Sequence, residues 1–292
     1  MSTVKIQQLT IFGVGLIGGS LAKALRKVGY CQKIVGCSRN REHLQRAVDL
    51  KVIDSYTLDP LAAVKDADMV LLAVPLGAME TILKLIKPAL SSNCIITDAG
   101  SAKGSVMAAV ERVFPEGCPQ FVAGHPIAGR EQSGVEAAIS DLYHDRRTIL
   151  TPLDSTHPTA LTAVSDMWQA AGARVEIMQV EQHDQVLAAT SHLPHLLAYN
   201  LVYTLSKSQK SADIFRYAAG GFKDFTRIAS SDPIMWRDIC SANRTAILDM
   251  IATYQSSLSE LADLIAQDDS QAVTEIFSEA KDARDQFLKT FK

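Results

Sequence analysis

The sequence predicts an α/β protein in which a Rossmann-like, mostly parallel sheet is followed by an all-helical dimerisation domain. Three observations support this prediction. A glycine-rich turn follows an apolar run near the start of the chain, short apolar runs then alternate with helix-like segments to about residue 180, and from residue 182 apolar residues recur at helical spacing. We therefore expect two domains, residues 1–180 and residues 181–292.

The first predicted strand, residues 9–13, ends in a glycine turn with the spacing G-x-G-x-x-G. Gly13 permits the tight turn, Gly15 lets the backbone approach a pyrophosphate, and Gly18 lets the next helix pack closely on the strand. The phosphates would lie at the N-terminus of that helix. The pattern predicts a dinucleotide site, while a glycine turn that serves packing alone is the other interpretation. The predicted cofactor-binding residues here are Gly13, Gly15, Leu16, Ile17 and Gly18.

The second predicted strand, residues 33–37, follows a helical stretch that ends at Gly29. In NAD-binding folds an Asp or Glu ends this strand and binds the ribose hydroxyls, but here Ser38 and Arg39 stand in that place and Arg41 follows. A carboxylate would repel a 2′-phosphate, whereas guanidinium groups form charge-assisted hydrogen bonds with it. We therefore predict NADP as the preferred cofactor and NAD as the alternative, unless the two arginines are only a solvated surface pair.

Further strands are predicted at residues 69–74, 95–98, 120–124, 147–151 and 174–178. Continuous apolar runs such as residues 69–74 fit strands that are buried on both faces. Pro75 ends that run, and ligands of open α/β sheets bind at the loops that follow the carboxyl ends of strands. Val74 and Pro75 are therefore predicted to contact the cofactor.

The second half of the chain is predicted to be helical throughout. One helix face carries a stripe of apolar side chains, namely Ile247, Met250, Ile251, Tyr254, Leu258, Leu261 and Leu264. A sheet domain with a long helical tail often dimerises through the tail, so we predict a homodimer. An ordinary core position for the stripe is the alternative.

Composition excludes several classes of protein. The 292 residues carry a net charge of −3 with cations and anions interspersed, so we expect no nucleic-acid partner. No apolar run is long enough for a membrane span, and we expect no membrane partner. Five cysteines without a pairing pattern suit a reducing compartment, which predicts a cytoplasmic protein.

Two polar segments follow predicted strands. Ser101 lies where an N-cap of the next helix would lie, so capping and catalysis are equally good interpretations. His125 stands between Gly124 and Pro126 at the end of a strand, where it is well placed to act as a general base near neutral pH. A purely structural histidine is the alternative.

Two further polar segments lie in the helical half. His192 and His195 are spaced i, i+3 near Pro194, which could start a helix; without a third ligand at a telling spacing we predict no metal site. We interpret His195 as a hydrogen-bonding group for a polar substrate, with a core histidine as the alternative. Arg227 could bind a carboxylate through its planar guanidinium, or could instead pair with Asp224 or Asp232 to brace a loop.

Taken together, these motifs closely resemble the prephenate/arogenate dehydrogenase family of tyrosine biosynthesis. The resemblance extends over nearly the whole chain, and five motifs in the right order are far more specific than any one of them. It rests on the glycine turn, residues 98–101, residues 124–129, residues 191–195 and residues 225–236. The resemblance implies NAD(P)-dependent oxidative decarboxylation of prephenate to 4-hydroxyphenylpyruvate or of arogenate to tyrosine.

The resemblance also implies roles for individual residues. His125 matches the catalytic histidine that takes the proton of the ring hydroxyl, and Ser101 matches the serine that hydrogen-bonds this histidine and the substrate. The matched substrate-binding residues are His195, Arg227, Gly220 and Trp236, and Glu131 and Asp224 match acidic residues linked with access to the site.

Two departures from the family pattern, Ser38-Arg39 and Arg130, bear on specificity. Ser38-Arg39 replaces the acid common in NAD-using members. Arg130 replaces a Thr or Ser, and we expect it to influence substrate preference or to pair with Glu131. Because NADP use and arogenate use occur together in some members, arogenate is slightly favoured. The rival interpretations are a β-hydroxyacid or imine reductase, whose catalytic lysine is replaced here by His192 and His195, and a non-catalytic NADP-binding sensor.

Overall fold

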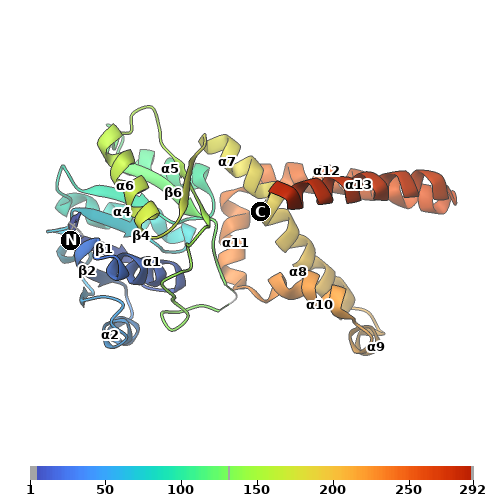
Figure 1. Cartoon of the computed structure of the whole chain (residues 1–292), viewed down its shortest axis with the longest axis horizontal. Coiled ribbons are helices and arrows are strands. Elements are labelled where there is room, and N and C mark those ends of the chain that lie inside the picture. Colours follow the sequence, from blue (N-terminus) through green and yellow to red (C-terminus); the bar gives the residue numbers. More distant parts are fainter. Residues whose placement is uncertain (1–4, 131, 291–292) are drawn as a thin grey trace. The chain divides into compact units, whose positions relative to one another are not determined.

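The computed structural model describes residues 5–130 and 132–290, and it contains an eight-stranded sheet (Figure 1). The strand order is β3-β2-β1-β4-β5-β6-β7-β8. The strands are β1 (Ile6–Phe12), β2 (Cys31–Cys37), β3 (Ser55–Thr57), β4 (Met69–Leu72), β5 (Ile95–Asp98), β6 (Phe121–Pro126), β7 (Arg147–Thr151) and β8 (Arg174–Ile177).

Strands β1 to β6 are parallel, with the order 3-2-1-4-5-6 of a dinucleotide-binding sheet. Strand β7 runs antiparallel to β6, and β8 runs parallel to β7. The predicted Rossmann-like, mostly parallel sheet is therefore confirmed. The short strand β3 was missed, and several predicted bounds were wrong: β1 and β2 begin earlier, at Ile6 and Cys31, β4 ends at Leu72 instead of Val74, and β6 extends to Pro126.

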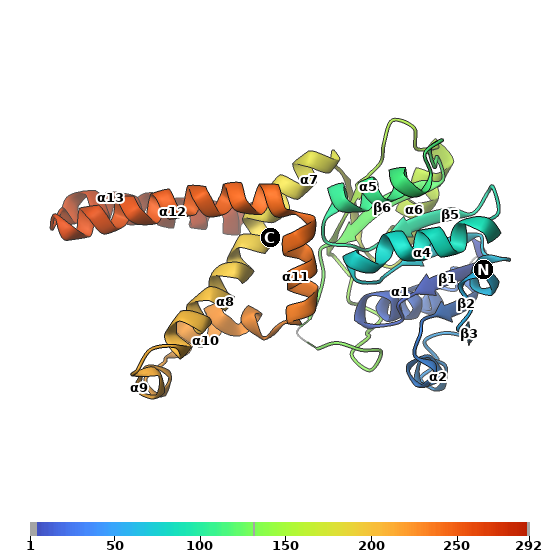
Figure 2. The same cartoon turned by 180° about the vertical axis from the view of Figure 1, so that it is seen from behind.

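Helices cover both faces of the sheet (Figure 2). Successive residues of a strand point into opposite cores. Ile11 of β1 and Leu71 of β4 pack in one core, and the residues that follow them, Phe12 and Leu72, pack in the other. This is why the strands are apolar without interruption. Helices of the first core are α1 (Leu16–Lys27), α2 (Arg41–Asp49) and α6 (Pro158–Ala170); those of the second are α3 (Pro60–Val64), α4 (Met79–Ile86) and α5 (Lys103–Val113).

The chain after β8 is helical in its described part, as predicted. Helix α7 passes into α8 through a π-helical turn, η3, next to Pro194, whose ring nitrogen has no N–H to continue the helical ladder. The elements are α7 (Val180–Leu187), η3 (Ala188–His192), α8 (Leu193–Ser206), α9 (Ser211–Arg216), α10 (Gly220–Thr226), η4 (Arg227–Ser230), α11 (Pro233–Ala242), α12 (Arg244–Ala266) and α13 (Ser270–Thr290).

The chain gathers into two compact units that divide between Arg244 and Thr245. The second unit holds nearly all of α12 and the whole of α13, which run side by side (Figures 1 and 2). On the predicted apolar face of α12, Ile247 is buried, whereas Tyr254 and Leu258 are 41% and 52% exposed. Among the described helices, none is both long and apolar enough to span a membrane.

Candidate active site

The turn from β1 to α1 has the geometry that a dinucleotide requires. Gly13 adopts φ +89°, and a Cβ there would lie 2.2 Å from the Ala73 carbonyl oxygen. A Cβ at Gly18 would lie 2.3 Å from the Gly13 carbonyl oxygen, whereas a Cβ at Gly15 would meet nothing within 4 Å. The N-cap residue Gly15 makes no side-chain hydrogen bond to the first turn of α1, so the helix terminus is open to phosphate oxygens.

The other predicted cofactor residues border the same carboxyl edge of the sheet. Ser38 follows β2, and its hydroxyl accepts a hydrogen bond from Asn40 N, while Asn40 caps α2. Arg39 and Arg41 are exposed and line an open hollow together with Ser38, Asn40, Glu42 and His43. Val74 and Pro75 follow β4, and Pro75 precedes the 3₁₀ turn η1 (Leu76–Ala78).

His125 lies at the carboxyl end of β6, on the sheet edge where β1 and β4 also end. The residue is only 8% exposed, and its Nδ1 lies 2.9 Å from Nε2 of His183. Burial lowers the pKa of His125 well below 6.5, and the nearby His183, Lys103 and His192 lower it further. The imidazole is therefore neutral at pH 7 and retains a lone pair that can accept a proton.

A buried ion pair fixes the backbone just before His125. Lys103 and Asp98 are both fully buried, and the Lys103 Nζ to Asp98 Oδ2 distance is 2.6 Å. The same ammonium donates to the Gly124 carbonyl at 2.6 Å, and Gly124 N donates to Asp98 Oδ1 at 3.0 Å. Burial lowers the pKa of Lys103, which Asp98 counteracts. The backbone N–H and C=O groups of Gly124, the residue before His125, are thus both hydrogen-bonded.

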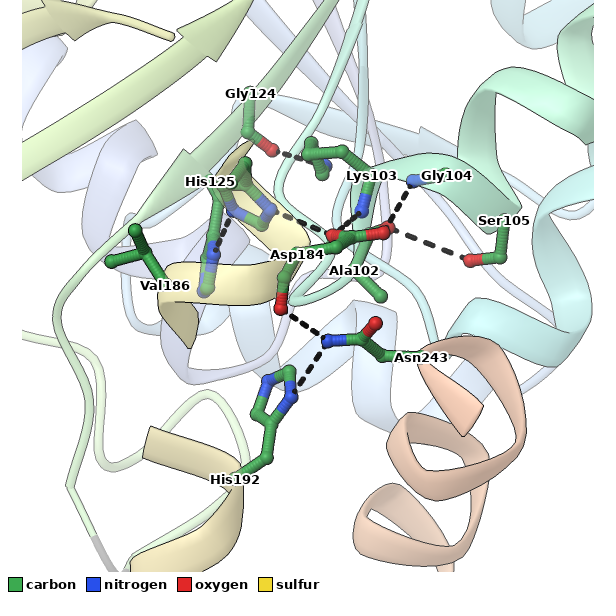
Figure 3. Close-up of polar contacts among 12 residues, drawn as sticks. Ala102, Lys103, Gly104, Ser105, Gly124, His125, Asp184, Val186, His192 and Asn243 are labelled. Carbon is green, nitrogen blue, oxygen red and sulfur yellow. Dashed lines mark hydrogen bonds and ion pairs between the residues drawn. The ribbon is translucent and has the colours of Figure 1, made fainter. Parts of the chain in front are cut away.

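The capping interpretation of Ser101 is wrong, because Ala102 is the N-cap of α5. Ala102 has no side-chain oxygen, and the free N–H groups of Lys103 and Gly104 donate instead to the two carboxylate oxygens of Asp184, both at 2.8 Å (Figure 3). Ser101 is half-buried. Among the contacts of the described residues, its hydroxyl makes no hydrogen bond with His125, whose Nδ1 faces His183.

A second histidine cluster lies on η3, α8 and α11. The His195 ring stacks on Trp236 with centroids 3.9 Å apart, and its Nδ1 lies 2.8 Å from the Ser191 carbonyl oxygen. His192 is 1% exposed, and its Nδ1 lies 3.1 Å from Nδ2 of Asn243. Burial lowers the pKa of His195, and it lowers that of His192 to about 4. Both rings are neutral at pH 7.

The remaining predicted site residues lie on exposed surfaces. Gly220 begins α10 and Arg227 begins η4, while Arg130 lines a separate hollow with Asp141, His144 and Arg146. Glu131 lies outside the described residues. Asp232 caps α11 by accepting hydrogen bonds from Ile234 N and Met235 N, and Asp224 is exposed on α10.

Sequence reasoning missed four polar residues that the structure brings to His125 or its neighbours. They are Lys103, His183, Asp184 and Asn243. No spacing connects them, because they come from α5, α7 and the end of α11. The adjacent His183-Asp184 pair near the start of α7 was the one available signal. In the described part of the chain, no three His, Cys, Asp or Glu side chains gather as a metal ion would require.

The chain is similar to known proteins over nearly its whole length. Family models described as "Prephenate dehydrogenase, nucleotide-binding domain" and "Prephenate dehydrogenase, dimerization domain" match residues 21–177 and 179–279. A cyclohexadienyl dehydrogenase of Zymomonas mobilis is 38% identical over 95% of both chains. A prephenate dehydrogenase of Bacillus subtilis is 36% identical over 95% of this chain and 75% of that protein.

Solved structures agree with these matches. The crystal structure of prephenate dehydrogenase from A. aeolicus in complex with hydroxyphenyl propionate and NAD+ is 41% identical, with a TM-score of 0.91 over 98% of this chain and 99% of that one. The Synechocystis arogenate dehydrogenase structure is 25% identical, with a TM-score of 0.81 over 96% of this chain and all of that one. On these matches and on this architecture, the chain belongs to the prephenate dehydrogenase family.

Proposed function

We propose that the protein oxidatively decarboxylates prephenate to 4-hydroxyphenylpyruvate, arogenate to tyrosine, or both, with a nicotinamide cofactor. The observation that carries this proposal is His125. It is a buried, neutral imidazole at the same sheet edge as a turn shaped for a dinucleotide. Membership of the prephenate dehydrogenase family supports the same conclusion.

His125 is the proposed general base. When bound, the nicotinamide supplies a hydride acceptor for ring carbon C4. His125 takes the proton of the hydroxyl on that carbon, and loss of the ring carboxylate as CO₂ makes the product aromatic. Ser101 is the proposed hydrogen-bond partner of the substrate hydroxyl.

The helical half would hold the rest of the substrate. His195 donates from Nδ1 to Ser191 O, so its neutral ring presents an acceptor at Nε2. Arg227 would bind a substrate carboxylate through its planar fork. Gly220 and Trp236 would line the pocket, and Arg130 would influence preference at the entrance. We propose that residues 1–180 bind the cofactor and that residues 181–292 form the substrate-binding and dimerisation domain.

We further propose that NADP is preferred over NAD. The support is that Ser38 in place of a carboxylate directly follows β2, and that the exposed cations Arg39 and Arg41 lie beside it. The A. aeolicus relative was crystallised with NAD+, which makes NAD the alternative to test. Replacing Arg39 with Ala should raise the Michaelis constant for NADP about 10-fold, as expected for a charged hydrogen bond, and leave that for NAD unchanged. Equal effects on both cofactors would contradict the preference.

We also propose a homodimer in the cytoplasm. The match to a dimerization domain over residues 179–279 and the exposed apolar side chains of α12 support the dimer. The five free cysteines suit a reducing compartment.

One assay tests activity, substrate and cofactor together. Reduced-cofactor absorbance is followed with prephenate and with arogenate, each with NADP and with NAD. We expect turnover with at least one substrate, faster with arogenate, and a loss of roughly 10²–10⁴-fold in His125→Asn. Cofactor binding by His125→Asn, followed by fluorescence, should be unchanged. No turnover of either substrate by the wild-type protein would refute the proposed function.

A further inference from the structure

We propose that His183 and Asp184 are positioning residues, which hold His125 in the tautomer with its lone pair on Nε2 and share the positive charge when His125 takes up a proton. This inference rests on the proposed function for its kinetic consequences, but its structural content stands by itself. Three side chains form one line of contacts: Asp184 Oδ1 lies 2.8 Å from His183 Nδ1, and His183 Nε2 lies 2.9 Å from His125 Nδ1.

Asp184 is held as an anion. Its carboxylate accepts hydrogen bonds from the backbone N–H groups of Lys103 and Gly104 at the start of α5, each at 2.8 Å (Figure 3). Burial would raise the pKa of Asp184, but the hydrogen bonds from His183, Lys103 N and Gly104 N outweigh it and lower the pKa. Its own backbone carbonyl accepts from Asn243 Nδ2 at 2.8 Å, which fixes α7 at this residue.

The charge on Asp184 determines where the protons of both rings lie. An ionised carboxylate can only accept, so His183 Nδ1 carries a hydrogen and donates it. In the proposed arrangement the Nε2 atom of His183 carries the lone pair and accepts. Since the atom that faces it is His125 Nδ1, that atom is the donor, and the lone pair of His125 is on Nε2. Among the described residues, none hydrogen-bonds to this Nε2 atom.

Within the described chain, this line of contacts is the only nearby feature that can stabilise the positive charge of a protonated His125. Each of the other charged or titratable groups that face the pair either disfavours the added positive charge or is already paired. Lys103 of α5 and His192 of η3 lower the pKa of His125, and Asp98 of β5 is paired with Lys103. When the substrate O–H bond breaks and an N–H bond forms at His125 Nε2, the Nδ1–H can shift towards His183 Nε2. The charge then lies beside Asp184.

Three variants test the proposal. Asp184→Asn replaces an obligate acceptor with an amide that can also donate, and His183→Leu removes the partner of His125 Nδ1. Each should lower kcat roughly 10²-fold, because a wrongly oriented base loses much of the gain from general-base catalysis. The Michaelis constants should stay within about twofold. His183→Gln offers an amide oxygen to His125 Nδ1–H and should recover most of the loss that His183→Leu shows.

The pH profile separates positioning from mere support of the fold. Without the Asp184 anion the protonated base is less stable, so the acid limb of kcat/KM should move to lower pH in Asp184→Asn. The matched control is Glu181→Gln, which removes the same charge from an exposed position of α7 three residues before Asp184. It should leave both kcat and the acid limb unmoved. A kcat of His183→Leu within about threefold of wild type, or an unmoved acid limb in Asp184→Asn, would overturn the proposal.

A measurement on the wild-type protein closes the test. Imidazole ¹⁵N chemical shifts of His125, assigned with His125→Asn and recorded with and without NADP, should show hydrogen on Nδ1 and none on Nε2. The opposite tautomer would overturn the inference. This arm needs no turnover, so it decides the positioning role even if the wild-type protein converts neither prephenate nor arogenate, an outcome that would refute the proposed function instead.

Discussion

At the scale of the residue, His125 combines low basicity with a prepared proton acceptor. Burial keeps the ring neutral, and the fixed backbone of Gly124 and the contact with His183 fix its position. A base of low pKa takes up a proton with little driving force, but aromatisation of the product compensates for this in the proposed reaction. The low pKa also widens the pH range in which the base is active.

The low pKa of His125 predicts the pH dependence of the reaction. Activity requires neutral His125, so kcat/KM should be flat through neutral pH and fall only in acid, at a pH well below 6.5. The measurement is kcat/KM with the better substrate from pH 4 upward, with protein stability checked at each pH. An acid limb centred near 6.5 would mean that His125 is solvated like a free imidazole, and it would contradict the geometry.

The low pKa of His192 predicts how the free energy of unfolding depends on pH. Its pKa is about 4 in the folded protein, against 6.5 for an unperturbed histidine such as that of the unfolded chain, a difference of about 2.5. Above pH 6.5 the ring is neutral in both states and the full stability is present. Between pH 6.5 and 4 the unfolded chain binds the proton more strongly, so the free energy of unfolding should fall by about 3 kcal/mol. Urea unfolding of wild type against His192→Gln should show a weaker pH dependence in the variant.

Among single residues, sequence reasoning found those that lie in recognisable motifs. His125 stands in a motif because Gly124 and Pro126 frame it at a strand end. His183 and Asp184 have no local pattern, because their role depends on α7 lying against the start of α5, a tertiary contact. Ser101 was placed correctly beside the helix start, but a side chain from a distant helix supplies the cap.

At the scale of the element, the β1–α1 turn was the most predictable part of the fold. Its three glycines are dictated by backbone geometry within a few residues, and local chemistry is what a sequence displays directly. Strand β3 could not be found, because Ser55, Tyr56 and Thr57 form no apolar run, and its pairing with β2 is all that makes it a strand. The antiparallel direction of β7 likewise depends on its partner.

The glycines of this turn predict two different phenotypes. In Gly18→Ala the added methyl would lie 2.3 Å from the Gly13 carbonyl oxygen, so the variant should lose about 1–3 kcal/mol of stability. In Gly15→Ala the methyl meets nothing within 4 Å, so stability should change little while the affinity for the dinucleotide falls. Urea unfolding and cofactor titration measure the two effects. Equal loss of stability in both variants would contradict the assigned roles.

At the scale of the whole molecule, α12 and α13 leave large apolar side chains open to solvent. Tyr254, Leu258, Ile265, Phe277 and Phe287 are each more than 40% exposed. A monomer seldom exposes so many large apolar side chains on two neighbouring helices, and burying them against a second copy would remove that surface from water. The helical stripe was visible in the sequence, but whether core or partner covers it depends on how the helices pack.

A charge on this stripe should therefore dissociate the proposed dimer. Leu258→Asp places a carboxylate in the centre of the apolar face, where an unpaired charge cannot be buried without a large desolvation cost. Ser256→Asp is the matched control, because it adds the same charge on α12 two residues away, off the stripe. Analytical ultracentrifugation should find wild type and Ser256→Asp as dimers, Leu258→Asp as a monomer, and a melting temperature that depends on protein concentration only in the first two. A Leu258→Asp dimer as tight as the wild type would show that the copies associate through another surface.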